Sequence, residues 1–295
     1  MKVKLSIITI NYNNADGLQS TMESVFNQTS KEFEYIVIDG GSTDTSCQVI
    51  SDQRLVINGE ISLSGISVKC ISEPDSGIYN AMNKGIGMAK GEYIQFLNSG
   101  DILASNDVTE KMLFELKVES EKLNDNTNSI PILYGNMMKK MPRRLLRDKG
   151  FSGRQPTMLD FYTGTLNHSP AYIKRTLFDT YGLYDESLRI VSDWKWYLQV
   201  IALNGIIPVY KDIDVTVFDM NGISNTNSTL EKQERREVLE EVLPLSVLAD
   251  YDCWASSIDQ MQRMNRYWPI RKGFWLVERM LFKWEKWVKN KEQVF

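Results

Sequence analysis

The chain has 295 residues, of which 42% are hydrophobic and 24% are charged, and its formal net charge at pH 7 is −4. This composition excludes disordered and collagen-like proteins, and the charge gives no reason to expect a nucleic-acid-binding protein. The length is sufficient for one large α/β domain with an appendage, or for two smaller domains.

Two features of the sequence bear on the cellular compartment. The sequence contains no run of about 18 apolar residues, and its N-terminal segment turns polar too early for a signal peptide, so we expect neither a membrane span nor a leader. The three cysteines, Cys47, Cys70 and Cys253, are odd in number and far apart, which is typical of buried thiols in a reducing compartment. We therefore expect a cytoplasmic protein.

The first hundred residues alternate predicted strands with predicted helices. Apolar, β-branched runs predict strands buried on both faces of a parallel sheet, at residues 5–10, 35–38, 68–72 and 93–97. Helical spacing of apolar residues predicts three helices between them, which extend to residues 26, 50 and 89. Ser42 or Thr43 is the expected cap of the second helix. This order is typical of a doubly wound sheet, whose ligands bind beyond the carboxyl ends of the strands. Polar clusters follow three of those ends, at residues 11–13, 39–42 and 98–101.

The elements after residue 103 are less regular. Two further helices are expected over residues 107–123 and 193–203. Short strands are expected over residues 132–134, 171–173, 206–210 and 215–218, and the last two are expected to pair. Residues 138–156 are basic and interrupted by glycine and proline, which predicts a long loop.

The C-terminal segment differs in charge from the rest of the chain. From Trp254 to Phe295 it holds nine Lys or Arg and four acidic residues, a net charge of +5, against −9 for residues 1–253. Val277, Leu281 and Trp284 lie on an apolar stripe at helical spacing. Such a helix could lie on an anionic membrane surface, or it could pack on the preceding domain or on a second subunit.

Four motifs in the first half of the chain carry a resemblance to a known family. They are SIITINYN (6–13), VIDGGSTD (37–44), EPDSGIYNAMNKG (73–85) and GEYIQFLNSGD (91–101). In order and spacing they resemble the family 2 glycosyltransferases, and a looser resemblance resumes at 168–175 and 182–194. The most similar type is the bacterial polysaccharide-assembly kind. The resemblance implies the α/β GT-A fold, a mixed and mainly parallel sheet flanked by helices, and a nucleotide-activated sugar as the donor.

The resemblance also implies a domain organisation. A GT-A catalytic domain would cover residues 1–225, with a nucleotide-binding half over 1–103 and an acceptor half over 104–225. Residues 226–295 would form a helical, basic and Trp-rich extension at the C-terminus.

The nucleotide-binding residues implied by the resemblance lie at the ends of the first two strands and around the helix that ends at residue 89. Asp39 would accept a hydrogen bond from the imide N–H of the base, which favours uracil, or it only closes its own turn. Asp75 would reach the ribose or the sugar, or it is an acidic residue favoured at a helix N-terminus. Lys84 would contact a phosphate, or it is a solvated surface lysine. The complete expected set is Thr9, Asn11, Asn13, Asp39, Ser42, Asp75, Asn83 and Lys84.

The segment Asn98-Ser99-Gly100-Asp101 is the candidate metal site. A diphosphate leaving group develops negative charge, which a divalent cation such as Mn²⁺ or Mg²⁺ neutralises. The Asp101 carboxylate is the expected ligand, and Asn98 stands where the family usually has an acid, so we expect a lower affinity for the ion. The same four residues are also ideal for a β-turn.

Asp193 is the candidate general base, because it stands where the family carries the acid that deprotonates the acceptor hydroxyl. The alternative is that Ser192 or Asp193 only caps a helix. Trp194 would stack on a sugar, or it belongs to the core. His168, the single histidine of the chain, would bind metal, phosphate or acceptor, or it is structural.

Together these features predict an inverting glycosyltransferase. It would move a sugar from a nucleoside diphosphate, expected to be UDP, to a hydroxyl of a glycan or lipid-linked acceptor in surface polysaccharide biosynthesis. A degenerate relative that binds nucleotide or glycan without turnover is the alternative, and Asn98 is its main support. A nicotinamide-dependent dehydrogenase is excluded, because no G-x-G-x-x-G follows the first strand. Contact of the tail with a membrane and a homo-oligomer both stay open.

Overall fold

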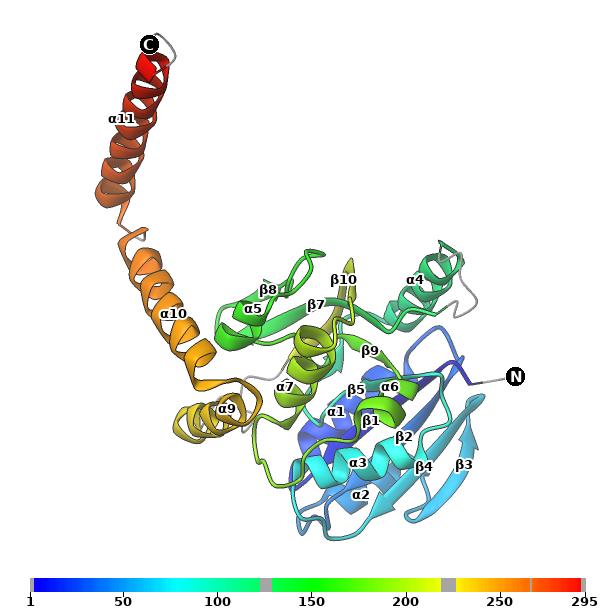
Figure 1. The fold of residues 1–295 in the computed structure, drawn as a ribbon. Helices are drawn as coiled ribbons and strands as arrows, with labels where there is room; N and C mark the ends of the chain where they lie inside the picture. The colour runs from blue at the N-terminus through cyan, green and yellow to red at the C-terminus, as the bar shows by residue number, and fades with distance from the viewer. Residues whose placement is uncertain (1–2, 123–128, 219–226, 266, 293–295) are drawn as a thin grey trace. The chain divides into compact units, whose positions relative to one another are not determined.

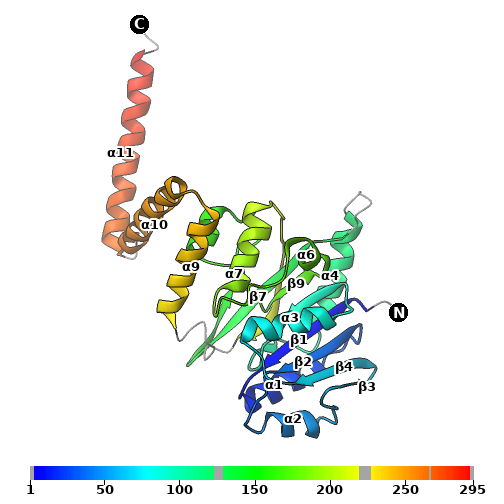
Figure 2. The ribbon, with the colours of Figure 1, turned by 60° about the horizontal axis from the view of Figure 1, so that its bottom comes forward.

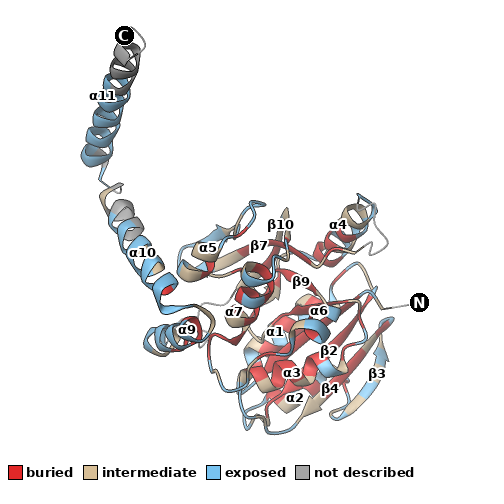
Figure 3. Cartoon of the chain, in the orientation of Figure 1, coloured by how far each residue is buried: buried red, intermediate tan, exposed pale blue. Residues whose placement is uncertain are grey.

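A computed structural model describes residues 3–122, 129–218, 227–265 and 267–292. The chain forms two compact units, Met1–Val238 and Leu239–Phe295. The first unit contains the whole described sheet and most of the buried residues, whereas the last two helices of the chain are largely exposed (Figures 1 and 3). The expected domain boundary at residue 225 lies outside the described residues and stays a prediction.

One mixed sheet of ten strands, within the described residues, forms the centre of the first unit. The strand order is β3-β4-β2-β1-β5-β9-β7-β10-β6, and β8 pairs with β7 outside this path. Parallel pairing joins β1 to β2, β1 to β5 and β2 to β4, so the carboxyl ends of these four strands lie at the same edge. The strands are β1 (Leu5–Asn11), β2 (Phe33–Asp39), β3 (Gly59–Leu63), β4 (Ile66–Ser72), β5 (Tyr93–Phe96), β6 (Ile102–Leu103), β7 (Ile132–Met141), β8 (Arg144–Asp148), β9 (Ala171–Lys174) and β10 (Val209–Phe218).

Helices cover both faces of this sheet (Figure 2). The described helices of the first unit are α1 (Ala15–Phe26), α2 (Ser46–Asp52), α3 (Ile78–Met88), α4 (Val108–Lys122), α5 (Met158–Thr163), α6 (Thr176–Tyr181), α7 (Ser192–Tyr197) with its π-helical continuation (Leu198–Leu203), and the greater part of α9 (Ser228–Val242). The second unit holds α10 (Leu245–Asn265) and α11 (Trp268–Glu292).

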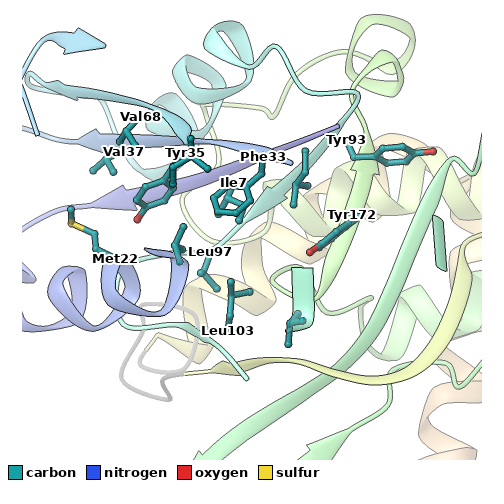
Figure 4. Close-up of a cluster of buried hydrophobic side chains, with 14 of the residues drawn as sticks. Ile7, Met22, Phe33, Tyr35, Val37, Val68, Tyr93, Leu97, Leu103 and Tyr172 are labelled. Atoms are coloured by element: carbon teal, nitrogen blue, oxygen red, sulfur yellow. The ribbon is translucent and has the colours of Figure 1, made fainter. Parts of the chain in front are cut away.

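The central strands are apolar throughout because both of their faces are covered. Ile7 belongs to a buried cluster with Met22 of α1 and Tyr35 of β2 (Figure 4). Ile8 faces the other way, against α3, where an added Cβ on Gly85 would stand 2.6 Å from Ile8 Cγ2. A strand between two helical layers has no solvated face, which explains why its sequence lacks polar alternation.

The predicted strands and helices of the first hundred residues are confirmed, apart from one cap. Helix α2 begins at Ser46 and not after Ser42 or Thr43. The hydroxyl of Ser42 is instead bonded to Asp39. The sequence pattern also missed the edge strand β3, which pairs antiparallel with β4.

Two predictions for the second half of the sheet are wrong. Residues 138–156 are not one long loop, because β7 continues to Met141 and forms an antiparallel hairpin with β8. Some of the basic side chains of this hairpin pair with acids, as Lys139 does with Asp148 at 2.7 Å. The two short strands expected over 206–210 and 215–218 are one strand, β10, which pairs with β7 and is irregular between Tyr210 and Asp214.

The other expectations have mixed outcomes. The helix expected over 193–203 exists, but it changes from α-helix to π-helix at Leu198. Cys70 is buried as expected, whereas Cys47 is partly exposed and Cys253 is exposed. Among the described helices, none is long and apolar enough to cross a membrane.

Candidate active site

The polar edge of the sheet is formed by the carboxyl ends of β1, β2 and β5. In the β1–β2 register Asn11 lies opposite Asp39, and β5 lies on the other side of β1, followed by residues 98–101. Parallel pairing aligns the ends of the strands, so the three polar clusters meet at one edge. In open α/β sheets this edge is the usual place for a ligand.

The carboxylate of Asp39 is fully buried and receives hydrogen bonds on both oxygens. Oδ1 accepts from Asn11 Nδ2 at 2.8 Å and from the Ser42 hydroxyl at 2.6 Å. Oδ2 accepts from the Ser72 hydroxyl at 2.7 Å and from the Ser42 backbone N–H at 3.0 Å. Burial by itself would raise the pKa of Asp39, but these hydrogen bonds outweigh it and hold the pKa below its usual value. Neutral donors therefore keep this carboxylate ionised.

Asn11 connects the two strand ends and retains an unused acceptor. Its Nδ2 also lies within hydrogen-bonding distance of the hydroxyls of Ser42 (3.2 Å) and Ser46 (2.9 Å). Its Oδ1 is buried and has no hydrogen-bond partner among the described residues. Leaving a buried polar atom unpaired is unfavourable, so this oxygen is a candidate acceptor for a ligand N–H.

The loop after β1 is joined to the loop after β2 by Asn13, which adopts a left-handed φ of 49°. Asn13 Oδ1 accepts from the Thr43 N–H at 2.8 Å, and the Asn13 N–H donates to the Ser42 hydroxyl at 2.8 Å. The adjacent Tyr12 is 66% exposed and lies beside Gly40, where an added Cβ would stand 3.3 Å from Tyr12 Cδ2. An exposed aromatic ring at this edge can stack on a planar base.

Asp75 lies at the same edge, against the backbone of Gly40. An added Cβ on Gly40 would stand 2.4 Å from Asp75 Oδ2, so this carboxylate leaves no room for a side chain at position 40. Burial raises the pKa of Asp75, and the negative charge of Asp39 adds to the rise. Asp39 and Asp75 thus have pKa values shifted in opposite directions, and Asp75 is the one that takes up a proton more readily.

The expected nucleotide ligand Thr9 lies inside the protein instead of at the polar edge. It is fully buried, its hydroxyl donates to Leu97 O at 2.8 Å, and it accepts from the Tyr35 hydroxyl at 2.9 Å. Both hydrogen-bonding capacities of this hydroxyl are therefore used by the sheet itself. Thr9 therefore joins β1 to neighbouring segments inside the sheet.

The expected donor ligands of α3 also have partners within the protein. The Asn83 side chain donates to Tyr184 O at 2.9 Å and to Glu186 Oε1 at 2.8 Å, and it accepts from the Tyr184 N–H at 3.0 Å. Lys84 forms an ion pair with Glu73 at 2.8 Å. Asn83 therefore holds the segment before α7 against α3, and Lys84 holds the loop before α3.

Residues 98–101 form a turn, in which the Asp101 N–H donates to Asn98 O at 2.9 Å. The turn is fixed to α1, because the Thr21 hydroxyl donates to Asp101 O at 2.7 Å. Asp101 is 4% exposed, and Asn98 Oδ1 is buried without a hydrogen-bond partner among the described residues. The β-turn expected as an alternative is therefore present, and it leaves an unpaired amide oxygen near a buried carboxyl residue.

These residues fit a divalent cation that takes most of its ligands from its substrate. Carboxylate and amide oxygens suit Mn²⁺ and Mg²⁺, and the orphaned oxygen of Asn98 is a suitable ligand atom. In the described part of the chain, however, no group of three or more His, Cys, Asp or Glu side chains could hold an ion. The diphosphate would have to supply the remaining ligands.

Asp193 lies in the first turn of α7 and contacts a tyrosine of α3. The hydroxyl of Tyr79 lies 2.8 Å from Asp193 Oδ1 and 2.6 Å from Ile190 O. Burial and the charge of Asp193 raise the pKa of Tyr79 well above its usual value, so the phenol keeps its proton. The N-cap of α7 is Val191, without a side-chain cap bond, so Asp193 is not the helix cap.

His168 is enclosed by the aromatic rings of Phe96, Tyr184 and Tyr197. It stacks on Phe96 with ring centroids 4.9 Å apart, and its Nε2 lies 2.9 Å from the Tyr184 hydroxyl. Burial lowers the pKa of His168, although the charge of Asp193 opposes the shift. A neutral imidazole in this position links the sheet to the segment that precedes α7.

Trp194 belongs to the core, as the alternative interpretation had it. It is 2% exposed, its Nε1 donates to Phe161 O at 2.8 Å, and the guanidinium carbon of Arg235 lies 4.7 Å from its ring. A buried ring of this kind cannot stack on a sugar, so the structure contradicts that role for Trp194.

Sequence reasoning missed three residues that the structure brings to the site. Ser72 ends a parallel strand at the polar edge, as Asp39 does. The alignment of parallel strand ends could therefore have predicted its position. Tyr79 lies within the third motif, but nothing in its spacing predicts a contact 114 residues along the chain. Tyr12 stands between two polar residues of the first motif, and the sequence pattern gives no sign that its ring is exposed at this edge.

The sheet order and the polar edge define an α/β protein with a candidate ligand site at the carboxyl ends of its parallel strands. The sequence profile described as Glycosyl transferase family 2 matches residues 6–178, and the chain belongs to this family. It is a glycosyltransferase with the GT-A fold, as the motifs predict.

Relatives and solved structures agree with this assignment. A PGL/p-HBAD biosynthesis glycosyltransferase of Mycobacterium tuberculosis is 25% identical over 230 residues, which are 75% of this chain and 79% of that protein. An uncharacterised glycosyltransferase of Rickettsia typhi is 26% identical over 242 residues, 80% of this chain and 70% of that protein.

Two solved structures share the fold at low sequence identity. TarS of S. aureus in complex with UDP-GlcNAc superposes with a TM-score of 0.61 at 20% identity, over 80% of this chain and 64% of that one. The mannosyltransferase PcManGT of Pyrobaculum calidifontis in complex with GDP-Man and Mn²⁺ superposes with a TM-score of 0.53 at 12% identity, over 91% and 82%.

Proposed function

We propose that this protein transfers a sugar, with inversion at the anomeric carbon, from a UDP-sugar to a hydroxyl of a glycan or lipid-linked acceptor in surface polysaccharide assembly. The observation that carries the proposal is the buried acceptor cluster at the polar edge, Asp39 with the orphaned Oδ1 of Asn11. This cluster suits the imide N–H of uracil. The complex of TarS with UDP-GlcNAc supports the same donor class by shared fold.

Base binding at this edge would proceed by exchange of hydrogen bonds. Both oxygens of Asp39 already have donors, so a ligand N–H would either displace the hydroxyl of Ser42 or Ser72 or bond to Asn11 Oδ1. The exposed ring of Tyr12 would stack on the base. Asp75, with its raised pKa, would bond to a ribose or sugar hydroxyl.

The diphosphate would lie near the turn of residues 98–101. A bound divalent cation would neutralise the negative charge that develops on the leaving diphosphate. Asp101 and the unpaired Asn98 Oδ1 would hold this ion on the protein side. PcManGT, whose structure contains Mn²⁺ with its nucleotide-sugar, supports a cation in this class of fold.

Asp193 would act as the general base. It would take the proton of the acceptor hydroxyl while that oxygen forms a bond to the anomeric carbon and the bond from that carbon to the diphosphate oxygen breaks. A single displacement of this kind inverts the configuration and releases UDP. Tyr79 stays protonated, and its single hydroxyl proton, shared between Asp193 Oδ1 and Ile190 O, would orient the Asp193 carboxylate. With Asp39, Asp101 and Asp193 all in place, we favour turnover over a degenerate binding protein.

Thermal unfolding with nucleotides tests the donor assignment. A ligand that binds only the folded state raises stability by RT ln(1 + [L]/Kd), so about 1 mM nucleotide with micromolar affinity gives a clear shift. We expect a shift with UDP that grows with Mn²⁺ and exceeds those with GDP, CDP and NAD. Equal shifts with all nucleotides, or none, would contradict the UDP assignment.

For α11 we propose contact with an anionic membrane surface, where a lipid-linked acceptor would be presented. Its apolar side chains Phe274, Leu281 and Trp284 are 52%, 54% and 61% exposed. Arg271, Lys272, Arg279 and Lys283 lie on the same helix with one acid, Glu278, among residues 268–284.

Co-sedimentation with vesicles tests this contact. We expect binding to vesicles that contain phosphatidylglycerol and not to phosphatidylcholine alone, and loss of binding in Leu281→Ser combined with Trp284→Ser. Glu278→Gln is the control that should retain it. Failure to bind either vesicle would reject the membrane contact.

A further inference from the structure

Three consecutive backbone N–H groups before α7 donate to a single carboxylate of α9. Glu234 accepts from Arg189 at 2.8 Å, from Ile190 at 2.9 Å and from Val191 at 3.3 Å. Glu234 is 5% exposed, so its charge is removed from water and offset by these donors. A glutamate 43 to 45 residues further along the chain therefore fixes the segment that leads into α7.

This carboxylate binds the backbone that leads into α7, and not the N–H groups of the first helical turn. The N-cap residue Val191 has no side-chain oxygen, and α7 has no side-chain cap bond of its own. Negative charge is favourable at a helix N-terminus, where backbone N–H groups lack partners. Both backbone groups of Ile190 have partners. Its N–H donates to Glu234, and its carbonyl oxygen accepts from the Tyr79 hydroxyl.

The next residue of α9 holds the other side of Asp193. The guanidinium carbon of Arg235 lies 4.7 Å from the ring of Trp194, and its Nη1 donates to Gly164 O at 3.0 Å. Trp194 directly follows Asp193 in the chain. Successive residues of α9 thus fix the backbone before Asp193 and the side chain after it.

We propose that Glu234 is a positioning residue of the glycosyl transfer, which orients Asp193 by fixing residues 189–191. The role of Asp193 rests on the proposed function, whereas the fixing of the segment does not. Both Glu234 and Arg235 lie beyond the residues 6–178 that match the family and beyond the expected catalytic domain. The start of the C-terminal extension is, on this proposal, part of the acceptor side of the active site.

Amide hydrogen exchange of Glu234→Gln tests the fixed segment directly. The substitution keeps the size of the side chain but replaces one acceptor oxygen with a donor NH₂ group that faces the backbone N–H groups. We expect exchange at residues 189–193 to become at least about tenfold faster, with little change in β1 and β2. Glu237→Gln, the same change at an exposed position one turn away on α9, is the matched control.

Transfer kinetics of the same variants test the positioning role. We expect kcat of Glu234→Gln to fall about 10- to 100-fold, since small misplacement of a catalytic group has effects of this size. The dissociation constant for UDP should stay within twofold, because the polar edge around Asp39 is untouched. A purely structural defect would lower the thermal midpoint and weaken UDP binding together with kcat.

Besides such a structural defect, three outcomes would overturn the inference: unchanged exchange at 189–193, unchanged kcat despite faster exchange, or equal effects of the Glu237→Gln control. If the wild-type protein neither binds UDP nor transfers sugar, the proposed function fails. The exchange experiment then still decides whether Glu234 fixes the segment.

Discussion

The two carboxylates at the centre of the proposed mechanism are held in different ways. Asp39 is surrounded by donors from strand ends and loops of the same sheet edge, within the first 72 residues. Asp193 is held by Tyr79, 114 residues earlier, and through the backbone of its segment by Glu234, 41 residues later. The proposed nucleotide side is thus local in sequence, whereas the proposed acceptor side is assembled from distant elements.

This difference predicts how substitutions will affect each side. On the proposed nucleotide side a ligand would exchange with the hydroxyl groups of Ser42 and Ser72, which donate to Asp39. On the acceptor side the direction of one carboxylate depends on the packing of α3, α7 and α9 against each other. Substitutions far from the chemistry should therefore affect catalysis more than nucleotide binding.

The largest expected effect comes from Asp193→Asn. The amide cannot accept the proton of the acceptor hydroxyl, so we expect the transfer rate to fall about 10²- to 10⁴-fold. UDP affinity, measured by calorimetry, should stay within twofold if the two sides are as separate as the structure indicates. Release of UDP from a donor that turns over is the rate measurement.

Asp179→Asn is the control for this change. Asp179 is an exposed acid of α6 whose carboxylate lies 3.9 Å from the Arg175 guanidinium, and we expect full activity. Full transfer by Asp193→Asn would remove Asp193 from its role and break the comparison of the two sides.

A smaller effect, of opposite sign, is expected on the nucleotide side from Asn98→Asp. A second carboxylate beside Asp101 adds charge to the ion's ligands, so we expect Mn²⁺ to bind about tenfold more tightly in the presence of UDP. Titration of Mn²⁺ at fixed UDP measures this change. The companion Asn98→Ala should weaken the dependence on Mn²⁺, and identical titrations for all three proteins would exclude the turn as a metal site.

The smallest expected effect is a pH dependence of stability due to His168. Its pKa is lowered in the folded protein, so below about pH 6.5 the unfolded chain binds more protons than the folded one. Stability should therefore decrease as the pH falls below about 6.5, with a slope of at most about 1.4 kcal/mol per pH unit, and should not depend on this group above pH 7.

Denaturant unfolding of the wild type and of His168→Gln between pH 7.5 and about 5 measures this slope. His168 is the single histidine of the chain, so the difference between the two proteins isolates it from the carboxyl groups. Parallel curves would show that His168 is as easily protonated in the folded state as in the unfolded one.

Much of the fold follows from local patterns in the sequence. Apolar runs such as that from Leu5 to Ile10 are unambiguous because both faces of the strand are buried. The β7–β8 hairpin could not be predicted in this way, since contacts such as the ion pair of Arg147 with Asp214 of β10 join residues that are distant in the chain. Strand β10 was divided in two because its irregular middle interrupts the apolar pattern.

The residues of the candidate site also fall into those that local patterns predict and those that depend on distant contacts. Asn11 and Asp39 could be placed together because parallel strands align their ends. The inward direction of Thr9 and the use of Asn83 to hold the segment before α7 depend on tertiary contacts. Glu234 gave no signal at all, because a glutamate on an amphipathic helix is ordinarily solvated.

Calorimetric titration of UDP in the presence of Mn²⁺, into the wild type and Asp39→Asn, tests the central claim most directly. We predict saturable binding to the wild type and at least a tenfold loss in the variant, because a buried acceptor for the base is replaced by an amide. If Asp39→Asn lowers the thermal midpoint, the titration is repeated with Ser72→Ala. This variant keeps Asp39 and removes only one of its hydrogen-bond donors. Absence of UDP binding to the wild type, or equal affinity in a folded Asp39→Asn protein, would contradict the account.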